Sequence, residues 1–276
     1  MSTLKKINIR DGNFGHHPLS IAYKQTSKYF EWCRDNEVVS KSCFITDLHL
    51  HEAVKCRSQR KIGWLVEPRA INPGIYEYAD KNYKEFDYIL TFDQELVESG
   101  RNFLFYPYGT SWIKDCWDLN PNKTKLCSMI ASDKKFTAGH AFRQEVIKKF
   151  SGIVDHYGRG FTYVENKEEA LEDYHFSIVI ENSQSNFYFS EKLLDCFACK
   201  TIPIYWGCDG IKQFFNTDGM FLFNDMDELE NIVSNLSHDQ YNEKIKYGHE
   251  NLKTMLTDSY HVTEDWLYEK YPFLFD

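Results

Sequence analysis

The sequence predicts an α/β protein made of two Rossmann-like domains that face a cleft. Apolar segments of strand length alternate with helical or loop segments along the chain of 276 residues. The strand segments are almost continuously apolar, which is typical of parallel strands buried on both faces. A polar segment at 115–125, which contains Pro121, interrupts the alternation, and the pattern restarts after it. Two domains of about 120–150 residues each fit this length.

The N-terminal domain is predicted over residues 1–120. Its strand segments are short, rich in β-branched and aromatic residues, and end near Pro, Gly or Asp. The predicted strands cover 42–48, 61–68, 86–93 and 102–109, and the predicted helices lie around 27–33 and 75–83.

The C-terminal domain is predicted over residues 121–276, with the last helix free to pack back on the N-terminal domain. Its strands and helices alternate in the order expected of βαβ units. The predicted strands are 126–132, 154–158, 175–182, 201–207 and 220–225; the predicted helices are 141–150, the segment from Glu191, 226–236, 239–257 and 262–270.

Composition and charge exclude several classes of protein. Hydrophobic residues make up 42% of the chain, so packed interiors are expected and disorder is not. The formal net charge of -9 does not fit a general nucleic-acid binder. Eight scattered cysteines are too few for a disulfide scaffold. The start has no apolar signal core, and no apolar run approaches the ~18 residues of a transmembrane helix. We therefore predict a soluble, cytoplasmic protein, and peripheral association with a membrane stays open.

The segment 176–207, FSIVIENSQSNFYFSEKLLDCFACKTIPIYWG, contains the strongest indication of function. An apolar strand ends at Glu181, and a helix begins with Glu191 and Lys192. The N-terminus of a helix favours anions, a lysine there can hold a phosphate, and a carboxylate there can accept hydrogen bonds from ribose hydroxyls. These residues predict a site for a nucleoside diphosphate. The alternative is a first-turn glutamate that interacts only with the helix dipole, next to a solvated lysine.

This segment resembles the donor-binding signature of glycosyltransferase family ten, the α-1,3/1,4-fucosyltransferases. The signature runs through an apolar strand, Glu-Asn, a loop, Tyr-x-x-Glu-Lys, a helix and IPIYWG. Phe189 and Ser190 depart mildly from the Val and Thr that are common in the family. The residues in register, which the resemblance implies bind the donor, are Glu181, Asn182, Tyr188, Glu191 and Lys192, followed by 203–207.

The resemblance extends less specifically upstream. Residues 128–150 resemble a strand followed by an arginine-bearing helix, which implies that Arg143 contacts the phosphates; the alternative is a solvated helix residue. Residues 63–96 resemble the acceptor-domain segment, which implies that Glu67 is the catalytic base. The alternative for Glu67 is a strand-end glutamate bonded to loop amides, and Glu77 and Asp47 are the reserve candidates for the base.

The resemblance implies a GT-B architecture and an inverting transfer of fucose from GDP-fucose to a glycan hydroxyl. No cofactor and no tightly bound metal are expected, and the predicted source is bacterial or viral. Two alternatives stay open. One is the same fold acting on another nucleotide sugar such as GDP-mannose, and the other is a catalytically silent nucleotide- or glycan-binding protein.

Four short motifs are typical of other sites but are interpreted as structural. An H-x-H needs further ligands to bind a metal, a C-x-x-C inside a helix is usually a pair of buried thiols, and an Asp-x-Asp before a helix is a natural cap. A short glycine-rich segment turns the chain. These motifs are His49 and His51, Cys196 and Cys199, Asp225 and Asp227, and residues 157–160.

Overall fold

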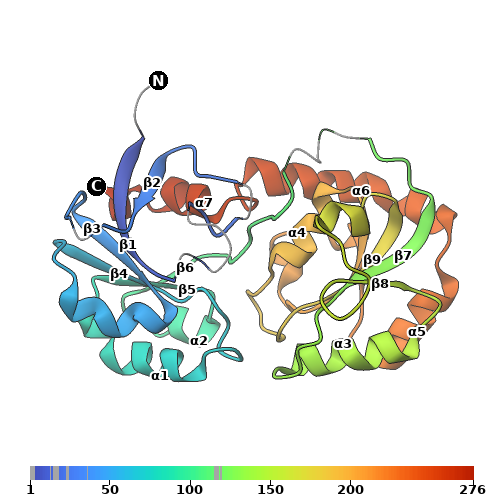
Figure 1. Cartoon of the computed structure of the whole chain (residues 1–276), viewed down its shortest axis with the longest axis horizontal. Coiled ribbons are helices and arrows are strands. Elements are labelled where there is room, and N and C mark those ends of the chain that lie inside the picture. Colours follow the sequence, from blue (N-terminus) through green and yellow to red (C-terminus); the bar gives the residue numbers. More distant parts are fainter. Residues whose placement is uncertain are drawn as a thin grey trace. The chain divides into compact units, whose positions relative to one another are not determined.

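The structure is a computed structural model that describes residues 4–12, 14, 19–22, 25–35, 37–114, 118 and 120–276. It divides into two compact units (Figure 1). Unit 1 is Met1–Thr110 with Val262–Asp276, and unit 2 is Ser111–His261. The boundary predicted between residues 120 and 121 differs from this division. Residues 115–117 and 119 of the predicted linker, including Cys116, lie outside the described residues.

Unit 1 is built on a six-stranded parallel sheet in the order β2-β1-β3-β4-β5-β6. Strand β3 is buried along its whole length, as expected for a strand in the middle of a sheet that is covered on both faces. The strands are β1 Lys5–Arg10, β2 Phe30–Cys33, β3 Ser42–Thr46, β4 Arg60–Trp64, β5 Tyr88–Thr91 and β6 Phe103–Phe105. The helices are η2 Asp47–Lys55, α1 Pro73–Asn82, η3 Tyr83–Glu85, α2 Gln94–Val97, α7 Thr263–Lys270 and η8 Pro272–Phe275.

The start of unit 1 differs from the prediction. The helix predicted around 27–33 is wrong, because Phe30–Cys33 is strand β2. Phe30 and Trp32 are buried on either side of an exposed Glu31, which is the two-residue period of a strand. Strand β1, whose Ile7 and Ile9 are buried, was not predicted.

Unit 2 has a five-stranded parallel sheet in the order β11-β10-β9-β7-β8. All five predicted strands and all four predicted helices of this unit are present, with their ends shifted by a few residues. The strands are β7 Lys125–Ile130, β8 Asp155–Tyr157, β9 Tyr174–Ile180, β10 Ile202–Trp206 and β11 Phe221–Leu222. The helices are α3 Ala138–Lys149, η5 Lys167–Ala170, α4 Glu191–Ala198, η6 Ile211–Gln213, η7 Thr217–Gly219, α5 Met226–Asn235 and α6 His238–Thr257.

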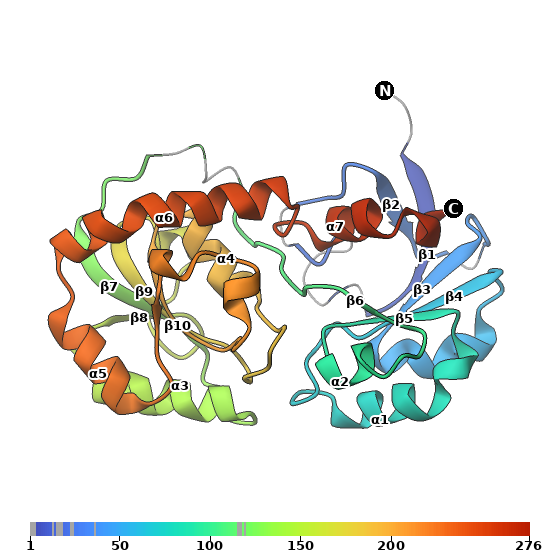
Figure 2. The ribbon, with the colours of Figure 1, turned by 180° about the vertical axis from the view of Figure 1, so that it is seen from behind.

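Helices cover both faces of the unit 2 sheet. Alternate residues of a strand point to opposite faces, and Val179 packs in the cluster with α4 and α6, whereas Ile178 packs in the cluster with α3 and α5. Figure 2 shows α6 beside α4, in agreement with the contacts between these two helices. The strands of this sheet are therefore buried on both sides, as their apolar sequences predict.

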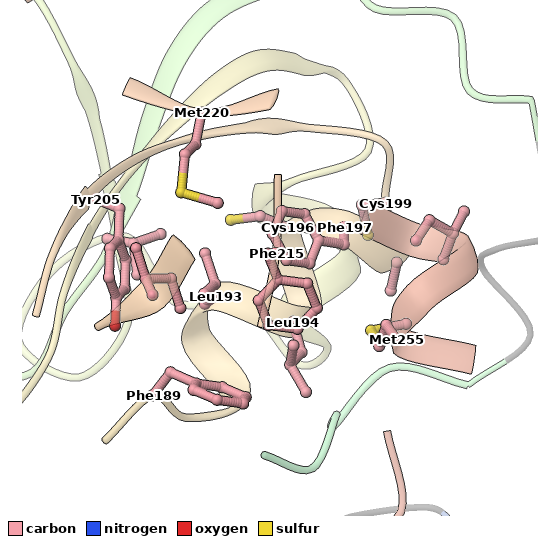
Figure 3. Close-up of a cluster of buried hydrophobic side chains, with 14 of the residues drawn as sticks. Phe189, Leu193, Leu194, Cys196, Phe197, Cys199, Tyr205, Phe215, Met220 and Met255 are labelled. Atoms are coloured by element: carbon pink, nitrogen blue, oxygen red, sulfur yellow. The ribbon is translucent and has the colours of Figure 1, made fainter. Parts of the chain in front are cut away.

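The apolar stripe predicted on α4 is confirmed. Leu193, Leu194, Phe197 and Ala198 are at most 1% exposed and pack in one cluster with Phe189, Tyr205, Phe215 and Met255 (Figure 3). Cys196 and Cys199 lie in the same cluster as free thiols, which confirms their structural interpretation. This packing fixes the rotation of α4 about its axis and therefore the positions of the side chains in its first turn.

The segment Val262–Asp276 completes unit 1. The carboxylate of Glu264, which is 0% exposed, accepts hydrogen bonds from Ser20 Oγ at 2.9 Å and from the Ile21 backbone N–H at 2.8 Å. Leu274 and Phe275 are buried in the same unit. Within the part of the chain that the structure describes, no helix has the length and apolar character needed to cross a membrane.

Candidate active site

The residues predicted to bind the donor lie at the carboxyl-terminal edge of the unit 2 sheet. Strands β9 and β10 end together there, because Ile180 pairs with Trp206 and the backbone N–H of Glu181 donates to the Trp206 carbonyl at 2.9 Å. Helix α4 begins at the same edge, with Ser190 as its N-cap. In a parallel sheet this edge collects strand ends and helix N-termini, which is where ligands bind.

Two glycines allow the backbone to pack tightly at this edge. A Cβ atom on Gly139, in the first turn of α3, would lie 1.8 Å from the Glu181 carbonyl oxygen. A Cβ atom on Gly207, directly after β10, would lie 2.5 Å from Cγ of Glu181. Without side chains at these positions, the start of α3 and the turn after β10 can both lie against Glu181.

Glu181 closes the loop that connects β9 to α4. Its side chain is fully buried, Oε1 accepts from the Ser190 backbone N–H at 2.8 Å, and Oε2 accepts from Ser190 Oγ at 2.6 Å. Lys192 Nζ lies 3.6 Å from Oε2. Both carboxylate oxygens are therefore engaged within the protein, and the contacts of Glu181 are those of a residue that fixes the start of α4.

Arg143 is buried rather than solvated, so the alternative of a solvated helix residue is wrong. It is 3% exposed, and its Nε and Nη2 donate to the carbonyl of Ile180, with 2.8 Å for Nε. Nη2 also donates to Asn182 Oδ1 at 3.0 Å. Burial lowers the pKa of the Arg143 guanidinium, and the nearby Glu181 opposes that shift. The arginine thus brings a positive charge to the carboxyl end of β9.

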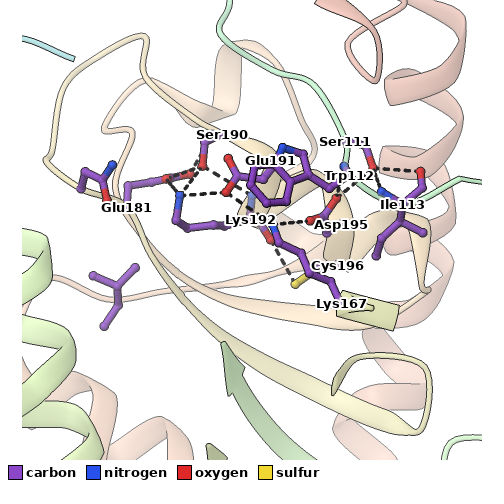
Figure 4. Close-up of polar contacts among 12 residues, drawn as sticks. Ser111, Trp112, Ile113, Lys167, Glu181, Ser190, Glu191, Lys192, Asp195 and Cys196 are labelled. Atoms are coloured by element: carbon purple, nitrogen blue, oxygen red, sulfur yellow. Dashed lines mark hydrogen bonds and ion pairs between the residues drawn. The ribbon is translucent and has the colours of Figure 1, made fainter. Parts of the chain in front are cut away.

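Glu191 and Lys192 form an ion pair in the first turn of α4 (Figure 4). Lys192 Nζ lies 3.2 Å from Glu191 Oε1 and donates to Ser190 Oγ at 3.0 Å. Burial by itself would raise the pKa of Glu191, but Lys192 and Lys167 outweigh burial and hold this pKa well below its usual range. Glu191 is therefore a carboxylate, an acceptor of hydrogen bonds, throughout the neutral pH range.

Lys167 and Asp195 complete the polar cluster (Figure 4), and neither residue was predicted from the sequence. Lys167 Nζ lies 2.9 Å from Asp195 Oδ2 and 3.4 Å from Glu191 Oε1. Asp195 Oδ1 accepts from Ser111 Oγ at 2.9 Å and from the Trp112 backbone N–H at 2.8 Å. Only the spacing of Glu191 and Asp195, one helical turn apart, could have indicated Asp195; Lys167 comes from a distant part of the sequence without any motif.

Tyr188, the last of the residues predicted to bind the donor, and the neighbouring His140 lie in the same unit. Tyr188 is buried, close enough to Arg143 to influence its pKa. His140, in the first turn of α3, is also buried, and burial together with the charges of Arg143, Lys134 and Lys192 lowers its pKa to about 4. The structure thus brings Arg143, Glu181, Asn182, Tyr188, Glu191 and Lys192 together at one edge of one sheet.

The predicted catalytic base, Glu67, lies in unit 1, three residues after β4. Its backbone N–H faces the carboxylate of Asp47, at 3.3 Å from Oδ2, and its carbonyl accepts from Tyr76 Oη at 2.9 Å. The side chain of Glu67 is partly exposed. Burial and the nearby Glu67 raise the pKa of Asp47 to about 7, although hydrogen bonds from Val66 and Glu67 oppose this shift. Glu77, the other reserve candidate, is exposed on α1.

The four motifs interpreted as structural have ordinary surroundings. Asp225 caps α5 by accepting from the backbone N–H groups of Asp227 and Glu228. His51 packs against the ring of Tyr78, and Gly158 has a φ of 107° in a turn. Among the described residues, no group of three or more His, Cys, Asp or Glu side chains is arranged to hold a metal ion.

Comparison with known proteins agrees with the resemblance seen in the sequence. Residues 120–255 match the family described as "Glycosyltransferase family 10 (fucosyltransferase) C-term". The chain is 32% identical to the alpha-(1,3)-fucosyltransferase FucT of Helicobacter pylori over 75 residues. This match covers 27% of the chain and only 16% of the Helicobacter pylori protein.

Solved structures resemble the chain over almost its whole length. A crystal structure of an α1,3-fucosyltransferase has a TM-score of 0.63 at 18% identity, and the match covers 99% of this chain and 89% of that one. A crystal structure of an α1,3-fucosyltransferase with GDP-fucose has a TM-score of 0.58 at 20% identity, covering 91% and 83% of the two chains. At these identities the likeness shows the fold alone, and it confirms the predicted class of two Rossmann-like α/β domains of the GT-B type. The family match over residues 120–255 and the site motif show that this part of the chain is similar to glycosyltransferase family 10.

Proposed function

We propose that the protein transfers fucose from GDP-fucose to a glycan hydroxyl with inversion at the anomeric carbon. The observation that carries this proposal is the Glu191–Lys192 pair in the first turn of α4, inside the region that matches family 10. The family name and the names of the relatives described above refer to fucosyltransferases, and one of these solved structures contains GDP-fucose.

Lys192 is the proposed ligand of the donor diphosphate. Its side chain is 24% exposed, whereas that of Glu191 is 11% exposed and that of Glu181 is fully buried, so the ammonium is the most accessible of these charges. The backbone N–H groups in the first turn of α4 add to the attraction, because a helix N-terminus favours anions. Glu191 is the proposed acceptor for the ribose hydroxyls.

Arg143 is proposed to act on the phosphates mainly through its charge. Three of its five N–H groups are engaged by Ile180 and Asn182, which leaves Nη1 for a direct contact. As the glycosidic bond breaks, negative charge grows on the leaving diphosphate, and nearby fixed cations stabilise that charge.

Glu67 is the proposed general base. In a single displacement the acceptor oxygen forms a bond to C1 of the sugar, the bond from C1 to the diphosphate oxygen breaks, and the hydroxyl proton moves to the base. GDP leaves with the electron pair. The positive charges of Lys192 and Arg143 are the proposed counter-charges for the leaving GDP. We therefore propose that transfer requires no tightly bound metal. The cytoplasmic location stays a prediction.

A thermal-shift screen followed by a transfer assay tests this function. A ligand at 100 times its dissociation constant adds about 2.7 kcal/mol to the free energy of unfolding, so GDP should raise the melting temperature and UDP should not. With a mixed pool of glycan acceptors, the enzyme should then consume GDP-fucose, and dialysis against EDTA should leave the rate unchanged.

The same experiment separates the alternatives. Stabilisation by UDP but not GDP would contradict the donor assignment. Turnover of GDP-mannose alone would keep the site but change the sugar. Stabilisation by GDP without turnover of any sugar nucleotide would identify a silent binding protein.

A further inference from the structure

We propose that Lys167 is a positioning residue for the nucleotide, and that it holds Glu191 so that this carboxylate can accept the ribose hydroxyls. This inference rests on the proposed function, in which Glu191 is the ribose acceptor. It adds a residue outside the family motif whose contribution concerns one part of the ligand, the ribose, and not the diphosphate.

Lys167 is held in place by three different groups. Its Nζ lies 2.9 Å from Asp195 Oδ2, 3.4 Å from Glu191 Oε1 and 4.0 Å from the centre of the Trp112 ring. An ammonium over an aromatic ring is attracted to its face. Its side chain is 19% exposed. Asp195 and Glu191 together raise the pKa of Lys167 against the effect of burial, so the ammonium keeps its charge at neutral pH.

Asp195 acts as the anchor of this arrangement. Its side chain is 1% exposed, and Oδ1 is taken by the Ser111 hydroxyl and the Trp112 backbone N–H. Only Oδ2 contacts Lys167, at the shorter of the two distances to a carboxylate. The Ser111 hydroxyl and the Trp112 backbone N–H thus fix Asp195, Asp195 fixes Lys167, and the ammonium of Lys167 reaches Glu191.

The two oxygens of the Glu191 carboxylate have different contacts. Both lysines, Lys167 and Lys192, contact the same oxygen, Oε1 (Figure 4). A carboxylate has two acceptor oxygens, so Oε2 is the oxygen assigned to the ribose. When Lys192 turns to the diphosphate, Lys167 stays with Oε1. Without it, two carboxylates one helical turn apart, Glu191 and Asp195, would lie buried next to each other without a cation between them, and Glu191 would turn away or take up a proton.

The experiment compares the affinities for GDP and for 2′,3′-dideoxy-GDP, which lacks both ribose hydroxyls, by isothermal titration calorimetry. Wild type should bind GDP about tenfold or more tightly than the dideoxy analogue, since tenfold corresponds to about 1.4 kcal/mol. Lys167→Met should lower the affinity for GDP but not for the analogue, so that the ratio of the two affinities approaches one. Glu191→Gln should lower the ratio likewise. Lys192→Ala should weaken both ligands equally and keep the ratio.

Lys123→Met is the matched control, because Lys123 is another partly buried lysine of unit 2 that donates to Leu171, Cys199 and Thr201. It should leave the ratio at the wild-type value. Lys167→Arg, which keeps the charge, should restore part of the ratio. A general loss of structure would weaken both ligands and could not change the ratio alone. If Lys167→Met fails to fold, Lys167→Gln takes its place in the same comparison.

The outcomes separate this inference from the proposed function. A wild-type protein that binds neither ligand contradicts the proposed function. A wild-type protein that binds both ligands equally, or a folded Lys167→Met variant that keeps the wild-type ratio, overturns the role of Lys167 and leaves GDP binding intact.

Discussion

Glu181 and Glu191 lie at the same edge of one sheet, but their surroundings give them different roles. Glu181 is fully buried, and both of its carboxylate oxygens accept hydrogen bonds from Ser190. Glu191 contacts its two lysines through one oxygen only. At the scale of single residues, a match to a family motif therefore does not say whether a residue is placed to touch a ligand or to hold the protein around it.

Lys192 and Arg143 should respond differently to truncation. Lys192→Ala should weaken GDP binding by about 1.5–3 kcal/mol, the range for a hydrogen bond to a charged group, and should lower the melting temperature less than Arg143→Ala does, because the Lys192 side chain is 24% exposed. Arg143→Ala should weaken GDP binding and also lower the melting temperature, because it leaves the buried carbonyl of Ile180 without its donors. Calorimetry with GDP and a thermal melt of each variant measure both effects, with the exposed Lys253→Ala on α6 as control. Equal melting temperatures for the two variants would contradict the anchoring role of Arg143.

Glu67→Gln tests the proposed base. Removal of a positioned general base lowers the rate about 10²–10⁴-fold, so fucosyl transfer should nearly stop while the affinity for GDP stays at the wild-type value. Glu77→Gln, an exposed glutamate of α1 in the same unit, should transfer at the wild-type rate. A Glu67→Gln enzyme with near wild-type turnover would exclude this residue as the base.

Asp47 should make the stability of the protein depend on pH. Its pKa is raised from 3.8 to about 7 in the folded state, chiefly by burial, so the folded state holds a proton that the unfolded state has lost above about pH 4. The associated stabilisation is complete below about pH 4 and is lost as the pH rises through about 7. Urea unfolding of wild type and Asp47→Asn across this range should show a smaller decrease for the variant, and the exposed Asp80→Asn should follow wild type. Parallel curves for wild type and Asp47→Asn would show that Asp47 does not carry the effect.

The first turn of helix α3 packs against the residues that follow β9, and this close packing depends on Gly139. A Cβ atom at Gly139 would lie 1.8 Å from the Glu181 carbonyl, and Gly139 itself donates to the Asn182 carbonyl at 3.2 Å. Such an approach to backbone cannot be relieved by a rotamer change. At the scale of elements, the carboxyl-terminal edge of the unit 2 sheet is therefore set by how closely α3 and β9 approach.

Gly139→Ala should lower the free energy of unfolding by about 1–3 kcal/mol or more, the usual cost of overpacking. The matched variant is Gly74→Ala in the first turn of α1, where no atom lies within 4 Å of the added Cβ. That variant should be neutral or slightly stabilising, because alanine favours a helix over glycine. Urea unfolding of both variants measures the difference, and equal stabilities would show that α3 can move away from β9 without cost.

The helices and strands were predicted well where the spacing of apolar residues agrees with the residues that begin or end an element. The segment 176–207 combines a long apolar strand, a cap at Ser190 and an apolar helical stripe, and its strand, helix and second strand are confirmed. The prediction of a helix at 27–33 failed because four aromatic and apolar residues in a short run fit the period of a helix as well as that of a strand. Only pairing with β1 makes Phe30–Cys33 a strand. Lys167 could not be predicted, because its contacts come from Trp112, Glu191 and Asp195, which only the folded chain brings together.

The whole molecule is divided unevenly along its sequence. Unit 2 is one continuous segment, Ser111–His261, whereas unit 1 needs Met1–Thr110 and Val262–Asp276. The second piece of unit 1 contributes Glu264, Leu274 and Phe275 to its interior. Each unit has its own parallel sheet and its own buried clusters, but only unit 2 is complete within one stretch of chain.

Two fragments test this division. Residues 111–261 alone should fold and show the GDP-induced rise in melting temperature, because every predicted donor-binding residue lies in them. Residues 1–261 should keep that response and lose the cooperative unfolding of unit 1, since the buried Glu264 and its partners are separated from each other. Circular dichroism melts with and without GDP measure both. A 1–261 fragment with the full unfolding enthalpy of the intact protein would show that the last segment is dispensable.

The chain leaves unit 1 after Thr110 and returns to it at Val262, and the two crossings are joined by the hydrogen bond from the Ser111 N–H to the His261 carbonyl at 2.9 Å. This arrangement has a consequence for biosynthesis. Domains generally fold as units while the chain emerges from the ribosome, in N-terminal to C-terminal order. Here the order is reversed, because unit 2 has all its residues before Val262 is made. The first piece of unit 1, Met1–Thr110, must wait with the sites for Glu264 and Phe275 uncovered, and chaperones that bind nascent chains have their longest opportunity at this piece of the protein.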